Sequence, residues 1–129
     1  MKSLLVVAGG GALGAVARYL VYIVAGHVLG TQFPYGTLIV NILGSFIMGA
    51  LTETMALVWS ASNEMRLFLA VGFLGAFTTF SSFSLDFAVL YERGLLLLCM
   101  VYVGVSVVCS IGALFAGMLL FRRLLSATF

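Results

Sequence analysis

The sequence predicts an all-α membrane protein with four transmembrane helices, and three observations lead to this fold class. Of the 129 residues, 64% are apolar and 8% are charged, against about 25% charged in a soluble domain. The mean hydropathy is +1.27. Turn residues and charges divide the chain into four apolar stretches of similar length. Six basic and four acidic side chains cannot cover a soluble surface, so the bilayer must be the solvent.

The four stretches account for nearly the whole chain, so residues 1–129 are expected to form a single domain. Each has about 25 residues, enough for a tilted helix to cross ~30 Å of hydrocarbon. The only proline, Pro34, lies in the first connection, and Ser62 or Asn63 can cap the third helix. The predicted spans are Leu4 to Leu29, Tyr35 to Trp59, Met65 to Tyr91, and Leu95 to Phe121, which Arg122 and Arg123 close.

An even number of spans places both termini on one side of the membrane. The opposite connections carry only Arg93 and His27 as basic residues. Basic residues favour the cytoplasmic side, so we expect cytoplasmic termini. A net charge of +2, scattered along the chain, argues against binding of nucleic acid. The basic residues on the side of the termini are Lys2, Arg66, Arg122 and Arg123.

In the second and fourth spans, a stripe of uncharged polar side chains follows one helical face. Such stripes supply hydroxyl and amide donors within the membrane. Hydrogen bonding between neighbouring helices is one interpretation, and the lining of a path for a polar solute is the other. The stripes are Thr37, Asn41, Ser45 and Thr52 in the second span, and Tyr102, Ser106 and Ser110 in the fourth.

The third span departs most from a regular helix. Five hydroxyl side chains occur within residues 78–84, shortly after Gly72 and Gly75. Serine and threonine compete for backbone hydrogen bonds, and glycine adds backbone freedom, so we expect this helix to be broken near its middle. A break at membrane depth must be buried in protein or line a wet cavity. It also frees carbonyl oxygens, which are suited to a hard cation such as sodium.

Two phenylalanines and three charges inside the spans have open roles. Phe80 and Phe83 would share a face of the helix after the break, where their ring edges can contact an anion or simply pack. Arg18, Glu53 and Asp86 are the charges. Arg18 needs a partner or water, which means either pairing with Asp86 or facing a wet vestibule that attracts anions.

Three segments, in this order and at these spacings, resemble the CrcB/Fluc family of small fluoride channels. They are GAVARY at 14–19, GTLIVNILGSFIMG at 36–49 and GFLGAFTTFSSFS at 72–84. The resemblance covers the whole chain in length and number of spans. It implies an antiparallel homodimer in the cell's inner (plasma) membrane, with two fluoride pathways lined by both subunits. Passive conduction through them would lower cytoplasmic fluoride.

The resemblance also implies roles for individual residues. Asn41 lies on the pathway, and Phe80 and Phe83 are the rings whose edges meet fluoride. The resemblance leaves Arg18 as either a vestibule residue or a structural one. A structural sodium ion at the centre of the dimer is held by backbone carbonyls. Ser82 stands where threonine is common in the family, and both supply a hydroxyl. The remaining implied residues are Tyr102, Ser106 and Ser110 on the pathway, and Gly75 and Thr78 at the sodium.

The chemistry of these residues suits a small, strongly hydrated anion. Neutral donors replace part of the water shell without the tight binding that a fixed positive charge would cause. Small residues would allow the close helix approach that a dimer needs. These glycines are Gly10, Gly14, Gly44, Gly49, Gly112 and Gly117.

Two other classes of protein are alternatives to a channel. A proton-coupled exporter of the small multidrug resistance type needs a central carboxylate, usually on the first span, where this chain has Arg18. A non-transporting scaffold would not need aligned polar stripes. We expect no enzymatic activity, because no Ser-His-Asp set or carboxylate pair is arranged for catalysis.

Overall fold

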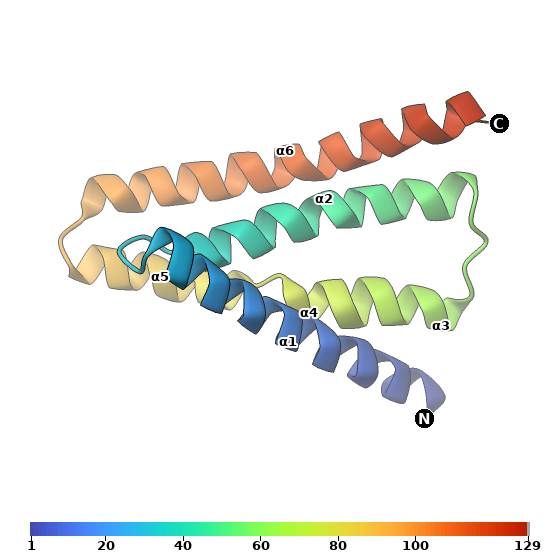
Figure 1. Cartoon of the computed structure of the whole chain (residues 1–129), viewed down its shortest axis with the longest axis horizontal. Coiled ribbons are helices and arrows are strands. Elements are labelled where there is room, and N and C mark those ends of the chain that lie inside the picture. The colour runs from blue at the N-terminus through green and yellow to red at the C-terminus, as the bar shows by residue number, and fades with distance from the viewer. Residues whose placement is uncertain (129) are drawn as a thin grey trace.

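The computed structural model describes residues 1–128, and every regular element in that range is a helix (Figure 1). Four segments of this range are long and apolar enough to cross a membrane, which confirms the predicted spans. They are α1 (Lys2–Leu29), α2 (Tyr35–Leu57), the segment Asn63–Glu92 and α6 (Leu96–Thr128). The third segment consists of α3 (Asn63–Arg66), the π-helix η1 (Leu67–Leu74), α4 (Gly75–Phe77) and α5 (Phe80–Glu92).

Both ends of the chain lie at the same end of the bundle, as an even number of spans requires (Figure 1). The opposite end carries the connection before α2 and the connection between α5 and α6. Gly30 and Gly94 in these connections have φ values of 86° and 72°, which glycine adopts without the clash that a Cβ atom causes. Arg93 joins the two connections, because it donates to the backbone and side-chain oxygens of Gln32.

The predicted end of the fourth span is wrong. α6 does not stop before Arg122 and Arg123 but continues to Thr128. Arg122 forms an ion pair with Glu53 of α2, so its charge is compensated while the helix goes on. Neither proline nor glycine follows to end the helix.

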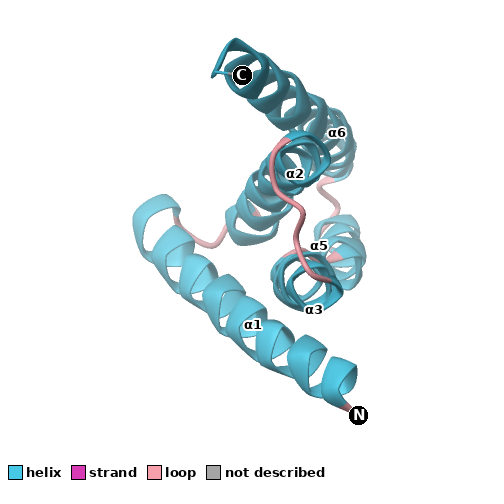
Figure 2. Cartoon of the chain, turned by 90° about the vertical axis from the view of Figure 1, so that its right-hand side faces the viewer, coloured by secondary structure: helices cyan, strands magenta, loops and turns pink. Residues whose placement is uncertain are grey.

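Two close helix contacts organise the chain. α1 crosses η1 and α4, and α2 runs along α6 (Figure 2). At the first contact, a Cβ atom on Gly10 or Gly14 would collide with the backbone carbonyl of Phe68 or Phe73, respectively. Backbone against backbone is the closest approach that two helices make, and only glycine permits it here.

The contact between α2 and α6 is built in the same way. A Cβ atom on Gly49 would meet the carbonyl oxygen of Leu114, and one on Gly117 would meet that of Phe46. Gly44 faces the side chain of Thr78. The prediction that the six glycines Gly10, Gly14, Gly44, Gly49, Gly112 and Gly117 serve a dimer therefore needs correction. Five of them pack closely against other residues of the same chain. Gly112 alone of the six has nothing within 4 Å.

Much of the apolar surface is not covered by the chain itself. The buried cluster consists of Leu90, Cys99 and Tyr102, where α5 meets α6. Large apolar side chains such as Leu97, 79% exposed, and Phe80, 77% exposed, point outward. Lipid or another membrane protein must cover a surface of this kind.

Gly117→Ala should destabilise the protein by about 1–3 kcal/mol, because the added methyl group forces α2 and α6 apart. Gly104→Ala is the matched control on the same helix, since nothing lies within 4 Å of that position. Thermal unfolding in detergent should show a lower midpoint for Gly117→Ala and little change for Gly104→Ala. Equal midpoints for the two variants would contradict this packing.

Candidate functional site

The helical backbone of the third span is interrupted at Thr78 and Thr79. Their ψ angles are 161° and 123°, both in the extended region, whereas α4 ends at Phe77 and α5 begins at Phe80. The Thr78 amide still donates to the Leu74 carbonyl at 3.0 Å, but the i to i−4 hydrogen-bond ladder stops after it, at Thr79. The backbone groups around this interruption therefore need other partners in the middle of the membrane.

Asn41 of α2 supplies two of those partners. Its Oδ1 accepts a hydrogen bond from the Thr79 amide at 2.8 Å, and its Nδ2 donates to the Thr79 carbonyl at 3.0 Å. One side-chain amide thus satisfies both polar groups of a residue that is only 8% exposed. The second hydrogen on Nδ2 remains available to a ligand.

Thr79 in turn caps α5. Its Oγ1 accepts from the amide of Ser82 at 3.1 Å, which is the usual role of an N-cap threonine. The same hydroxyl donates to Oγ of Ser82. The N-terminus of α5, with its partial positive charge, is thereby fixed inside the membrane-spanning segment.

The hydrogen bonds from the Thr79 amide to Asn41 and from the Ser82 amide to Thr79 leave two backbone carbonyls without their helical donors. In a continuous helix the Gly75 carbonyl would accept from the amide of Thr79, and the Thr78 carbonyl from that of Ser82. Both amides donate to side-chain oxygens instead. Among residues 1–128, no group of three or more His, Cys, Asp or Glu side chains could hold a metal ion. Backbone oxygens are therefore the groups here that suit a hard cation.

A groove of about 380 Å³ lies beside the interruption, between α2, α5 and α6. Of the described residues that line it, none is charged. The Oγ atoms of Ser106 and Ser110 are buried in its wall without a hydrogen-bond partner. The groove brings together most of the predicted pathway residues, namely Asn41, Phe80, Phe83, Ser106 and Ser110.

Aromatic rings continue from the groove into the core. The ring centroids of Phe80 and Phe83 are 5.4 Å apart, so the prediction that they share a face is confirmed. Phe83 lies 5.2 Å from Tyr102, which meets Phe33 edge-on at 5.5 Å. Phe80 is 77% exposed and Tyr102 is fully buried, so the rings lead from the surface to the interior.

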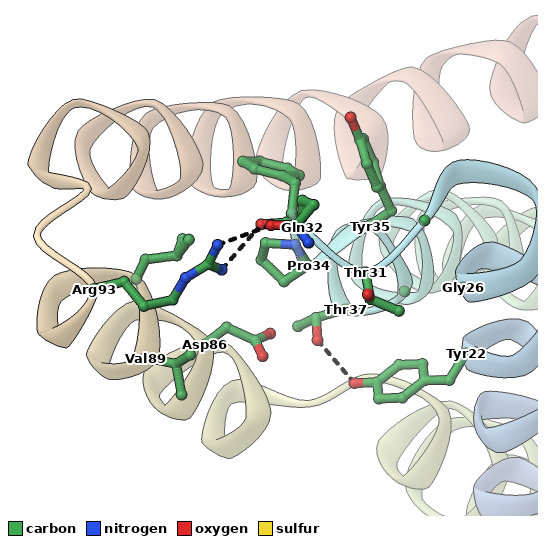
Figure 3. A pocket seen from close by; sticks show the side chains of 14 residues that line it. Tyr22, Gly26, Thr31, Gln32, Pro34, Tyr35, Thr37, Asp86, Val89 and Arg93 are labelled. Carbon is green, nitrogen blue, oxygen red and sulfur yellow. Dashed lines mark hydrogen bonds between the residues drawn. The ribbon is translucent and has the colours of Figure 1, made fainter.

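A smaller pocket of about 230 Å³ lies near the connections (Figure 3). The Tyr102 hydroxyl donates to the Asp86 carboxylate at 2.9 Å, and the hydroxyls of Tyr22 and Thr37 are hydrogen-bonded at 2.9 Å. Tyr22 had no signal in the sequence, because a tyrosine in a membrane helix is unremarkable. The position of Thr37 on the polar stripe of α2 was the signal available for that residue.

Arg18 does not pair with Asp86, which corrects one of its two interpretations. It is half-buried and forms no ion pair or hydrogen bond within residues 1–128. Asp86 is instead hydrogen-bonded by Tyr102. The vestibule interpretation of Arg18 stays a prediction.

A family model described as CrcB-like protein, Camphor Resistance (CrcB), matches residues 5–118. The chain belongs to the CrcB family. The predicted family is confirmed, and with its four apolar helices this CrcB protein is a multi-pass membrane protein.

Several similar proteins carry a functional name. The chain is 55% identical to the fluoride-specific ion channel FluC of Rhodospirillum centenum, over 95% of this chain and 97% of that protein. It is 55% identical to the FluC of a Chelativorans species, over 97% and 100% of the two chains. The identity to the FluC of Agrobacterium fabrum is 54%, over 96% and 99%. These names are those of channels, in agreement with the expectation that this CrcB chain is not an enzyme.

Asn41→Ala should loosen the interruption of the third span in the CrcB chain, because two backbone groups of Thr79 lose their partners. Each unsatisfied group costs about 1–3 kcal/mol. Hydrogen–deuterium exchange should become faster in peptides that cover residues 78–84. Thr52→Ala is the control on the same helix, since its hydroxyl bonds only to the backbone of Met48. Unchanged exchange in Asn41→Ala would contradict the role of this amide.

Proposed function

We propose that this protein is a fluoride-selective channel that lowers cytoplasmic fluoride by passive export. The observation that carries the proposal is the pair of buried, unpartnered hydroxyls of Ser106 and Ser110 in an uncharged groove. A buried hydroxyl without a partner is costly in a folded protein, so a polar ligand is the natural partner. The names of the similar proteins support fluoride as that ligand.

The groove suits an ion whose main barrier to entry is the loss of its water. Ser106, Ser110 and the second Nδ2 hydrogen of Asn41 replace part of the hydration shell. The N-terminus of α5 adds a partial positive charge. A full cation in the same place would hold the ion too tightly. Phe80 and Phe83 present polarised ring edges where no donor is available, and Tyr102 extends this row inward. A narrow bore would hinder the larger chloride ion.

An antiparallel homodimer is part of this proposal. The groove is open along one side, and Phe80 at its edge is 77% exposed. A second copy inserted in the opposite orientation would cover the groove with protein and create a second, equivalent pathway. Arg18 has no partner among residues 1–128, and we assign it to a wet vestibule where it attracts anions.

A structural sodium ion fits the two free carbonyls. Gly75 and Thr78 offer one oxygen each, and a second copy would offer two more around the centre of the dimer. When bound, sodium would supply a fixed charge that draws the two interruptions together. The donor set consists of neutral oxygens, as a monovalent hard cation prefers.

The structure gives no support to a proton-coupled exporter. Such a mechanism needs a carboxylate that is free to exchange protons and substrate in turn. Asp86 is hydrogen-bonded by Tyr102, and Glu53 is paired with Arg122. A dependence of transport on a proton gradient would be required to revive that alternative.

Fluoride efflux from liposomes that contain the pure protein, run beside chloride, tests the proposal. The natural chain should pass fluoride and retain chloride. Phe80→Ile and Phe83→Ile should each lower fluoride efflux at least tenfold, because the polarised ring edges are lost. Phe115→Ile is the control, since Phe115 is 57% exposed and lies outside the groove. Equal passage of the two halides by the natural chain would refute the proposed function.

The double variant Ser106→Ala, Ser110→Ala should also lower fluoride efflux strongly, while stability stays the same or rises slightly. The hydroxyls have no partner among residues 1–128, so their removal breaks no hydrogen bond within that range. Thr54→Ala serves as a control, since that hydroxyl bonds to the backbone of Ala50. Efflux and unfolding would be measured on the same preparations. Full efflux in the double variant would remove the serines from the path.

A further inference from the structure

An ion pair between α2 and α6 is left unexplained by the proposed pathway. Arg122 donates from Nη2 to Oε1 and from Nε to Oε2 of Glu53. The Glu53 side chain is 6% exposed, whereas that of Arg122 is 55% exposed. One side of the Arg122 guanidinium therefore contacts a buried carboxylate, and its other side is exposed. Neither residue lines the groove.

The position of Arg122 relates it to the groove. Ile111 lines the groove, and Arg122 follows eleven residues later on the same helix. Eleven residues make just over three whole turns, so Arg122 follows Ile111 on the same line of the helix, about 16 Å along the axis. Ser106 and Ser110 point more than about 100° away from that line. The pair also lies close to the Gly49 and Gly117 contact, where α2 and α6 approach most tightly. Arg122 thus stands beyond the groove, in line with Ile111 at its edge, toward the end of the bundle that carries both termini (Figure 1).

We infer that Glu53 and Arg122 form a charge-balanced mouth of the anion path at this end. The open side of Arg122 raises the local concentration of a small anion. Glu53 keeps the guanidinium from holding that anion, since a full, uncompensated cation on the path would slow its release. This inference rests on the proposed function and adds two residues that determine the rate at which fluoride enters.

A mouth and a plain structural clamp make different demands on the pair. A clamp needs the two charges to meet, whichever helix carries which sign. A mouth needs the positive charge on α6, on the open side. The effect of a mouth also weakens in salt, because the screening length falls from about 30 Å at 0.01 M to about 3 Å at 1 M. If the ion pair is only a structural clamp, its removal changes efflux only where it also disrupts the fold.

The experiment measures the initial rate of fluoride efflux from proteoliposomes at about 0.01 M and about 1 M potassium isethionate. The double variant Glu53→Gln, Arg122→Gln removes both charges and leaves none buried alone. Its rate should be two- to fivefold below that of the natural chain at low salt and equal to it at high salt. The swap Glu53→Arg, Arg122→Glu keeps the ion pair but moves the positive charge to α2. Its efflux rate at low salt should be no higher than that of the double Gln variant. Arg123→Gln is the control for the loss of one positive charge on α6, about 100° away from Arg122 around the helix, and should change the rate less.

Glu53→Gln alone tests the balancing role of the carboxylate. Arg122 then remains as an uncompensated cation, and fluoride efflux should saturate at a severalfold lower fluoride concentration with a lower maximal rate. Recovery of the natural rate by the swap, or a loss of rate that does not depend on salt, would overturn the mouth in favour of a clamp. A double variant as fast as the natural chain at low salt would overturn it too. No fluoride efflux from the natural chain itself would be a failure of the proposed function, which is a separate result.

Discussion

The hydrogen bonds between Asn41 and Thr79 are the interaction on which the rest of the site depends. Hydrocarbon offers no partner to a backbone amide or carbonyl, so a helix cannot be interrupted there without a substitute. A single carboxamide supplies both a donor and an acceptor at 3.0 and 2.8 Å. Few other side chains combine the two functions without charge. The extended pair at Thr78 and Thr79 can exist in this span because α2 presents that group.

Other features of the site follow from this one pairing. Once the Thr79 amide donates to Asn41, the Gly75 carbonyl loses its helical donor, and Thr79 is free to cap α5 through Ser82. α5 then begins inside the span, which places its positive end and the ring of Phe80 beside the groove. A continuous helix would hide all of these groups in its own hydrogen bonds. The interruption therefore creates the polarity of the site without adding a charge.

The sequence predicts what depends on composition and short spacing, and it fails where distant residues meet. Four spans and the pairing of Phe80 with Phe83 follow from hydropathy and a separation of three residues. The partner of Asn41 lies 38 residues away and that of Arg122 lies 69 residues away, so no local sequence pattern predicts these contacts. Glycine spacing predicts close helix packing but does not say whether the partner is the same chain. For that reason the spacing predicts a dimer contact for Gly117, whereas in the structure Gly117 packs against α2 of the same chain.

The charges of the spans are separated from the groove in a way that fits passage of an anion. Glu53 and Arg122 balance each other on one side of it, and Asp86 is held by Tyr102 on the other. Between them lie hydroxyls, one amide and ring edges, and no full charge that would hold an anion in one place. Binding weak enough for release requires such neutral contacts in series, and attraction from solution requires charge, but only at the ends. A chain with so few charged residues meets both requirements because Glu53, Asp86 and Arg122 each have a partner that limits the reach of the charge.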